Sequence, residues 1–302
     1  MTKPAVTSIA EKMRELLGSQ EQVILLDDLV TSRIKLVAQA LAPEAFPTSV
    51  PISNDEFVKR AKRYEDVVAD LVPIVVLLAK WGEGRQLPTL AKIYSRLAEL
   101  PPASNGIVGW VRLGWHPLHF LIYAGGVAAM SARNYPALKA VLMAPVYSRE
   151  GDSESFEQPV LVRALKAILE IGDSFKAFPG FEKKRLPRSE YMHSLIHKPI
   201  EDEVFLSASY DTHFDEFEIV VGLLIADFEK MRGSSAWGPM GRFVWRHSSG
   251  SKTSSYGRFL SEVAAAGENW DGLRAGLFGS SVERLKEIVE AYNTNVARGS
   301  TW

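Results

Sequence analysis

The stretch WHPLHFLIYAGGVAAMSARNYPALKAVLM, residues 115–143, decides the fold of this chain. It contains the longest nearly uncharged run, Pro117 to Ser131, in which apolar residues would surround a helix on every side. A helix of that composition is buried on all of its faces. The run covers about 13 to 15 residues, whereas a helix that crosses a bilayer needs about 20. We therefore predict a core helix and no membrane segment.

A turn and a second helix follow this run. Ser131 to Asn134 supplies a polar break, with Asn134 as the expected left-handed cap, and the second helix ends before Pro145. Gly125 and Gly126 would each cost about 1 kcal/mol against alanine in an exposed helix, so we expect another backbone to approach them closely. Together these features predict a buried central hairpin over about residues 117–144.

The remaining chain has the period of amphipathic helices, which predicts an all-α multi-helix bundle of packed helical hairpins. Pro73 lies inside a helical pattern over 53–81 and should kink or split it. Residues 190–198 are expected to form one or two helical turns, and Thr212 is expected to cap a helix that runs to Met231. Two prolines between residues 100 and 105 indicate a boundary between an N-terminal helical subdomain (1–104) and a C-terminal one (105–302).

The composition excludes several classes of site. There are 35 basic and 36 acidic residues, so no strong overall field favours nucleic acid or an anionic membrane. There is no cysteine, which excludes disulfides, thiolate metal sites and a cysteine nucleophile and fits a reducing compartment. The N-terminal MTKPAVTSIAEKMREL has no apolar core of a secretory signal, so we expect a cytoplasmic protein.

Histidines and acids between residues 193 and 213 form the one candidate metal cluster. Its members are His193, His197, Asp211 and His213. Two histidines four residues apart on a helix can share a zinc ion, and a carboxylate could complete the site of a metal-dependent hydrolase or nuclease. The motif His193-Ser-Leu-Ile-His197, however, lacks the glutamate that follows the first histidine in zincins. His116 and His119, at the start of the buried helix, are expected to be satisfied or partly buried histidines and not a pair of metal ligands.

Residues 237–258 form a basic and aromatic segment that could contact a partner. The candidate binding residues are Trp237, Arg242, Trp245, Arg246, Lys252 and Arg258. Aromatic rings stack on bases and cations neutralise phosphates in single-stranded nucleic acid. The competing interpretation is a solvated loop whose aromatic side chains enter the core. A second, smaller basic cluster comprises Lys183, Lys184, Arg185 and Arg188.

Motifs for common catalytic machinery are missing from the sequence. It has no Gly-x-Ser-x-Gly nucleophile elbow, no complete phosphate-binding loop and no dinucleotide fingerprint. A catalytic triad assembled from distant segments would leave no such trace. The sequence therefore assigns no catalytic residue and no cofactor.

Three groups of residues carry a resemblance to a known class of proteins. They are Gly241-Arg-Phe-Val-Trp245, then Gly276-Leu-Phe-Gly279 with the following Ser280-Ser-Val-Glu-Arg284-Leu, and Tyr123-Ala-Gly-Gly126 with Asn134-Tyr135. They are similar to helical regions of large prokaryotic multidomain proteins, where such regions lie beside effector or NTPase domains in antiphage-type systems. The resemblance implies a sensor or scaffold module and carries over no catalytic residue.

These observations lead to one function prediction and two alternatives. We expect a non-enzymatic helical interaction subunit of a prokaryotic defence or regulatory assembly, with a protein partner and an additional contact to nucleic acid through residues 237–258. The alternatives are a metal-dependent hydrolase or nuclease that uses the histidine and aspartate cluster, and a single-stranded nucleic-acid-binding protein.

Overall fold

The computed structural model describes residues 8–100, 105–146, 158–204, 209–246 and 254–299, and this part of the chain is an all-α multi-helix bundle. Its α-helices are α1 (Ile9–Leu17), α2 (Val23–Ala40), α3 (Asn54–Val68), α4 (Val72–Trp81), α5 (Leu87–Ala98), α6 (Val108–Leu113), α7 (His116–Ser131), α8 (Tyr135–Leu142), α9 (Val160–Leu169), α10 (Pro187–Val204), α11 (Tyr210–Met231), α12 (Phe243–Arg246), α13 (Ser255–Ala266), α14 (Asp271–Arg274) and α15 (Val282–Gly299). Short 3-10 helices are η1 (Gln20–Gln22), η2 (Ala69–Leu71), η3 (Gly84–Gln86), η4 (Gly172–Ala177), η5 (Gly267–Asn269) and η6 (Leu277–Ser280). Strands β1 (Pro145–Val146) and β2 (Gln158–Pro159) pair antiparallel.

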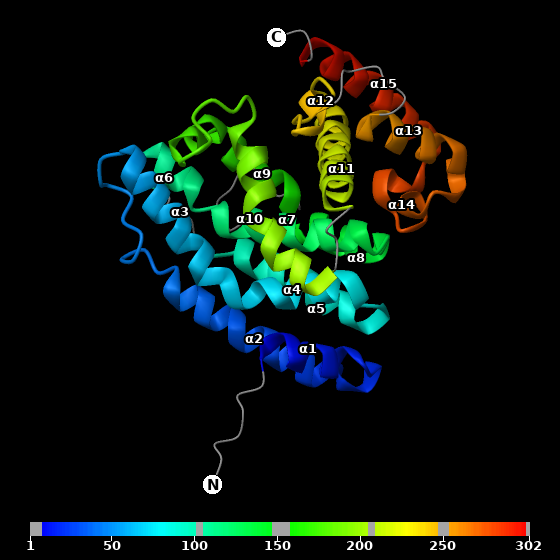
Figure 1. Cartoon of the computed structure of the whole chain (residues 1–302). Helices are drawn as coiled ribbons and strands as arrows, with labels where there is room; N and C mark the ends of the chain where they lie inside the picture. Colours follow the sequence, from blue (N-terminus) through cyan, green and yellow to red (C-terminus); the bar gives the residue numbers. More distant parts are fainter. Residues whose placement is uncertain (1–7, 101–104, 147–157, 205–208, 247–253, 300–302) are drawn as a thin grey trace.

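Helix α7 occupies the centre of the molecule (Figure 1). Every residue from His116 to Met130 is buried, which confirms the prediction of a helix covered on all faces. Helices α3, α4, α8, α9, α10 and α11 all pack against it, with α4 making the most extensive contact. The predicted hairpin is completed by α8, which folds back on α7.

The turn of the hairpin differs from the prediction in one residue. Arg133, with φ of 51°, adopts the left-handed conformation expected of Asn134. Asn134 instead caps α8, because its side-chain oxygen accepts a hydrogen bond from the backbone N–H of Ala137 at 3.2 Å. An asparagine that precedes a helix can satisfy one of the free N–H groups of the first turn. Asn134 therefore caps α8, and Arg133 takes the left-handed position of the turn.

The close approach expected at the two glycines of α7 exists, but side chains make it and not backbone. A Cβ added to Gly125 would lie 2.3 Å from the hydroxyl oxygen of Tyr94 on α5. A Cβ added to Gly126 would lie 2.0 Å from the ring of Phe217 on α11. The two glycines therefore let aromatic side chains from two other helices reach the surface of α7.

Pro73 splits the predicted long helix, as expected. Helix α3 ends at Val68, η2 makes one tight turn, and Pro73 lies in the first turn of α4, where its missing N–H costs no hydrogen bond. Helices α3, α4 and α5 then pack on α7 and α8, and their apolar side chains join one buried cluster that includes residues on both sides of the predicted boundary at 104. The division into two subdomains stays a prediction.

Two elements that carry candidate site residues differ from the sequence prediction. Helix α10 has 18 residues, with Pro199 inside it, and is much longer than the expected turns over 190–198. Its buried residues Met192, Ile196 and Ile200 recur every four positions, so tertiary packing supports the helix through the proline. Helix α11 begins at Tyr210, which places Thr212 inside the first turn and not at the cap.

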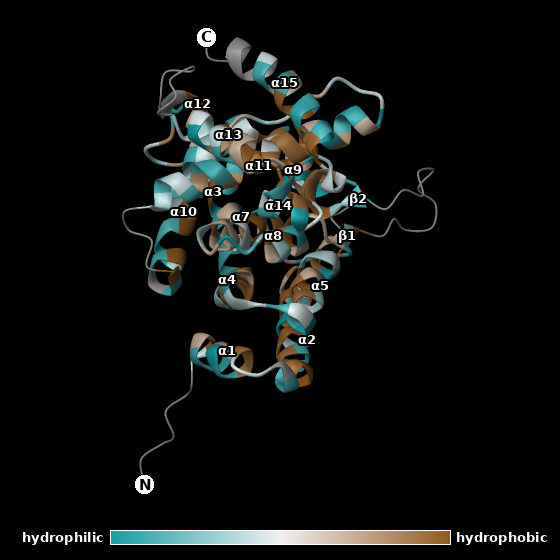
Figure 2. Ribbon diagram, turned by 90° about the vertical axis from the view of Figure 1, so that its right-hand side faces the viewer, coloured by the Kyte–Doolittle hydropathy of each residue, from teal (hydrophilic) through white to brown (hydrophobic). Residues whose placement is uncertain are grey.

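Colouring by hydropathy shows apolar residues gathered between the helices (Figure 2). Within the described ranges, no helix has both the length and the apolar composition needed to cross a membrane. Helices α1 and α2 lie together at one end of the molecule in both ribbon views.

Candidate functional site

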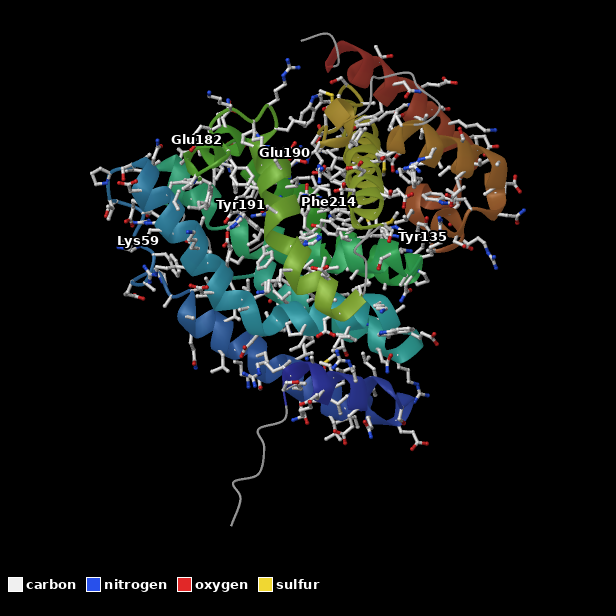
Figure 3. The ribbon with its side chains drawn as sticks, in the orientation of Figure 1. Lys59, Tyr135, Glu182, Glu190, Tyr191 and Phe214 are labelled. Atoms are coloured by element: carbon white, nitrogen blue, oxygen red, sulfur yellow. The ribbon has the colours of Figure 1, made fainter. Side chains whose placement is uncertain are left out.

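A cluster of polar side chains is buried where α7, α10 and α11 meet, and we refer to it as the core polar cluster. Its members are His119 and Tyr123 of α7, Arg188 and Ser189 of α10, and Glu218 of α11. All five are at most 5% exposed. Buried charged groups are rare unless they are paired, so a cluster of them indicates a network of partners. In Figure 3 the labelled Phe214 of α11 and Tyr191 of α10 lie in the interior beside it.

Hydrogen bonds connect the members of the core polar cluster into one network. Arg188 donates through Nη1 to the hydroxyl oxygen of Tyr123 at 2.5 Å and to Nε2 of His119 at 3.1 Å. The Tyr123 hydroxyl in turn donates to Oε1 of Glu218 at 2.9 Å. Nη2 of Arg188 lies 3.7 Å from the same carboxylate oxygen, so a buried ion pair accompanies the hydrogen bonds.

The surroundings shift the pKa values of three members of this network, Glu218, Arg188 and His119. Burial raises the pKa of Glu218, although Arg188 and the hydrogen bonds from Ser189 and Tyr123 act against that rise. Burial also lowers the pKa of Arg188, but Tyr123 and Glu218 outweigh it and the net pKa is raised, so the guanidinium keeps its charge. Burial, with Arg188 next, holds the pKa of His119 well below its usual value. His119 is thus a neutral acceptor for Arg188.

The core polar cluster also anchors the chain that follows α11. The backbone N–H of Arg242 donates to Oε2 of Glu218 at 3.0 Å and to the hydroxyl of Ser189 at 2.9 Å. The Ser189 hydroxyl donates to the same carboxylate oxygen at 2.7 Å. Glycine is needed at position 241, because an added Cβ would lie 1.9 Å from Oε2 of Glu218. A buried carboxylate therefore fixes the backbone at the start of α12.

A second, more exposed group lies beside this anchor and links α10, α11 and the start of α12. Nε2 of His193 lies 2.7 Å from Oδ1 of Asp211, and Nη1 of Arg242 donates to the same oxygen at 3.1 Å. The His193 ring also packs on Tyr210 and Phe214. The Asp211 side chain is 45% exposed, whereas that of His193 is 20% exposed. A histidine held by a carboxylate can act as a general base, but the same pair also joins two helices without any chemistry.

The four predicted metal ligands do not form one site. His193 and Asp211 come together. Nδ1 of His197, however, lies 3.7 Å from Oε2 of Glu201 on the same helix, and Nδ1 of His213 lies 3.3 Å from Oε2 of Glu216. Across the described ranges, no group of three or more histidine, aspartate or glutamate side chains could hold a metal ion. The structure thus brings together two of the four residues and offers no metal centre for the hydrolase alternative.

The six candidate residues of the 237–258 segment are placed in different ways. Trp237 is 44% exposed and Arg258 is exposed, so both face solvent. Arg242 is only 8% exposed and its guanidinium binds Asp211. Trp245 and Arg246 belong to α12, but their side chains, like all of Lys252, lie outside the described residues.

The predictions made from the sequence for His116, His119 and Arg188 can also be compared with the structure. His116 is fully buried and its Nε2 lies 2.9 Å from Oε1 of Glu65, while Nε2 of His119 accepts from Arg188, so both histidines belong to the core. Among the described residues, Nδ1 of each ring is buried without a hydrogen-bond partner, so neither histidine is fully satisfied. Arg188 was grouped with the basic residues at 183–185, but it is buried in the core polar cluster and contributes no surface charge.

The low pKa of His119 predicts how stability depends on pH. In the unfolded chain this histidine gains a proton below a pH of about 6.5, whereas in the folded protein it stays neutral, so acidification favours unfolding. We expect the free energy of unfolding to fall by about 1 kcal/mol between pH 6.5 and 5.5 through this group alone. His119→Gln keeps an acceptor for Arg188 but cannot titrate, and urea unfolding at both pH values should show a smaller fall.

The raised pKa of Glu218 acts in the opposite sense, because its stabilising contribution is present in acid and is lost as the pH rises above the usual value of 4.5. The wild type and His119→Gln both contain Glu218, so its contribution cancels when their pH dependences are compared. Equal pH slopes for the wild type and for His119→Gln would contradict the assignment to His119.

Comparisons with known proteins give no relative from which a role could be transferred. No protein-family model matches this chain, and no curated protein and no solved structure is significantly similar to it.

Proposed function

We propose that this protein is a non-enzymatic helical interaction subunit and that α2 carries the surface that binds its protein partner. The observation that carries the proposal is a set of three large apolar side chains that α2 exposes to solvent, Ile24 and Leu25 near its start and Leu36 near its end, which we call the apolar strip. Ile24 is 71% exposed, Leu25 is 57% exposed and Leu36 is 53% exposed. Isolated apolar residues at the surface are ordinary, but three large ones that protrude from one helix support a contact with another protein.

The geometry of α2 suits a helix-to-helix contact. Its inner face is buried through Leu26, Val30, Ile34 and Val37. Leu25 and Leu36, eleven residues apart, lie at nearly the same angle around the helix, at the edge of this buried face, and Ile24 lies about 100° away from Leu25. From Leu25 to Leu36 this side of the helix is about 16 Å long at the rise of an α-helix. That length matches three turns of a partner helix, which would bury the apolar strip.

A shallow hollow between α1 and α2 extends the strip at the same end of the molecule. It has a volume of about 420 Å³, and the residues that line it include Lys12, Glu15, Leu25, Asp28 and Leu29. Its rim carries both signs of charge around apolar side chains, which is the pattern of a protein interface with a polar rim. An amphipathic helix with acidic and basic residues beside its apolar face is therefore the partner that we propose.

The class of assembly rests on the resemblance of the chain to helical regions of antiphage-type proteins. We propose a prokaryotic defence or regulatory complex as the first context to test. A supplementary contact with nucleic acid through residues 237–258 is supported by the exposed Trp237 and Arg258, while Arg242 is occupied by Asp211.

The test replaces two residues of the strip and measures retention of the partner. Leu25→Asp with Leu36→Asp should weaken a stoichiometric, nuclease-resistant complex by about 100-fold, since each buried anchor of an interface contributes about 1 to 2 kcal/mol. Affinity capture from a lysate of the source cells, followed by mass spectrometry, identifies the partner. Titration of the recovered partner then measures its affinity for the wild type and for the variant.

The matched control is Val108→Asp on α6, because Val108 is 64% exposed and lies far along the chain from α2. This variant should bind the partner as the wild type does, and both variants should keep the wild-type unfolding midpoint within the small range of surface substitutions. A partner that binds the α2 variant unchanged would refute the α2 surface. Recovery that disappears with nuclease would favour the contact through residues 237–258.

A further inference from the structure

A partly enclosed pocket is lined by residues of α2, α3, α5, α6 and α7 and of the loop that joins α2 to α3. Its volume is about 120 Å³, and four aromatic side chains line it. They are Phe46, Tyr64, Trp110 and Trp115. Most of the other lining residues are aliphatic. The pocket does not include the exposed strip of α2 and contains none of the residues of the core polar cluster.

The walls of the pocket are held in place by hydrogen bonds to the backbone of its loop. Nη1 of Arg60 donates to the carbonyl oxygen of Pro47 at 2.6 Å, and Nε1 of Trp110 donates to the carbonyl of Val50 at 2.6 Å. The N–H of Ile107 donates to the carbonyl of Thr48 at 2.9 Å. The loop is thus fastened to α3 and α6, and the pocket exists before any ligand arrives.

Two arginine side chains pack on aromatic rings that line the pocket. The guanidinium of Arg60 lies 4.1 Å from the centre of the Trp110 ring, and that of Arg63 lies 4.7 Å from the centre of the Phe46 ring. Phe46 also stacks on Tyr64 with ring centres 4.0 Å apart and planes 10° apart. These contacts hold the rings rigidly, which lowers the entropy cost of ordering a binding site.

Tyr64 supplies a polar group that its own chain leaves unused. It is only 6% exposed, and in the described part of the chain its hydroxyl has no hydrogen-bond partner. Burial raises its pKa to about 12, with Arg60 and Arg63 acting against that rise, so the hydroxyl stays protonated near neutral pH. The hydroxyl oxygen is not sealed from solvent, so it can donate a hydrogen bond to the acceptor of a bound ligand in place of water.

We propose that this pocket binds a small planar apolar molecule, of about one aromatic ring, whose single acceptor oxygen takes a hydrogen bond from Tyr64. The volume supports the size, because an engineered apolar cavity of about 150 Å³ binds benzene. Aromatic walls favour a flat ring, and an apolar lining with few polar groups is the usual composition of a small-molecule site.

Two probes of nearly the same shape test the chemistry. Acetophenone has a carbonyl acceptor, whereas isopropylbenzene has a methyl group in its place. The protein should bind acetophenone about three- to tenfold more tightly than isopropylbenzene, as one net hydrogen bond would give. Tyr64→Phe should remove this preference while it retains the binding of isopropylbenzene. Saturation-transfer NMR with each probe, and titration of tryptophan fluorescence, measure the affinities.

Filling the pocket tests its location. Ala38 lines the pocket on α2, and Ala38→Leu should weaken both probes at least tenfold. The control is Ala40→Leu, the same change at an exposed position two residues along the same helix, which should leave binding unchanged. Absence of saturable binding of either probe to the wild type, or equal binding by Ala38→Leu and Ala40→Leu, overturns the proposal. Equal affinity of the wild type for the two probes overturns the role of Tyr64.

Discussion

Replacing Glu218 with leucine is expected to lower the free energy of unfolding by about 3 to 5 kcal/mol, the cost of removing one partner from a buried ion pair. The loss leaves Arg188 buried and charged without its carboxylate. It also removes the acceptor for the hydroxyls of Tyr123 and Ser189 and for the backbone N–H of Arg242. Urea unfolding measures the change.

Combining Glu218→Leu with Arg188→Met separates two contributions to the loss of stability. One is the cost of a buried charge that has lost its partner, and the other is the free energy that the ion pair itself contributes. Arg188→Met alone should be about as damaging as Glu218→Leu, but the two together should lose less than the sum, with a coupling of about 2 kcal/mol. Arg133 and Glu262 form the control pair, since both side chains are about half exposed and their ion pair should contribute about 1 kcal/mol or less. Additive losses at Arg188 and Glu218 would contradict the buried pair.

The same variant reports on the anchored segment after α11. If Glu218 fixes the backbone at Arg242, the amide hydrogen of Arg242 should exchange faster in Glu218→Leu than global destabilisation explains. Amides of the central part of α7 provide the internal reference, because their exchange follows global unfolding.

The helices that the sequence predicts well are those whose pattern is local. The uncharged run after Pro117 indicates burial on all sides, and the structure confirms it for α7. Pro73 divides its helix because proline lacks an N–H wherever it stands. Helix α10 was predicted too short, since Pro199 resembles a stop signal and only the burial of Ile200 and Val204 in the folded protein accounts for the helix that continues past it.

The core polar cluster left only a partial signal in the sequence. Glu218 stands inside the apolar run of α11, and a carboxylate at such a position indicates a buried partner. Its partner could not be identified, because Arg188 lies in another helix and follows three surface cations that suggest a solvated cluster. Pairing of residues from different helices depends on tertiary packing, which local patterns do not encode. The same reason separates the buried Arg242, which binds Asp211, from the exposed Trp237 and Arg258 of the same segment.

Replacing Gly126 with valine is expected to destabilise the protein by about 3 kcal/mol, because overpacking a rigid core forces side chains or helices apart. A Cβ there would lie 2.0 Å from Cε2 of Phe217 and 2.6 Å from its Cζ, and Phe217 is fully buried. The damage should lie at the contact of α7 with α11, the two helices that carry Tyr123 and Glu218.

A compensating change shows whether this contact is the cause. Phe217→Ala alone should cost about 3 to 5 kcal/mol through the cavity that it leaves. In combination with Gly126→Val, the total loss should fall short of the sum by about 2 kcal/mol, because the valine side chain enters that cavity. Gly172→Val is the matched control, since a Cβ at Gly172 meets no atom within 4 Å and the substitution should change stability by about 1 kcal/mol or less. If Gly126→Val were as harmless as Gly172→Val, α11 would not rest directly on the glycine face of α7, and the geometry that brings Glu218 to Arg188 would need another explanation.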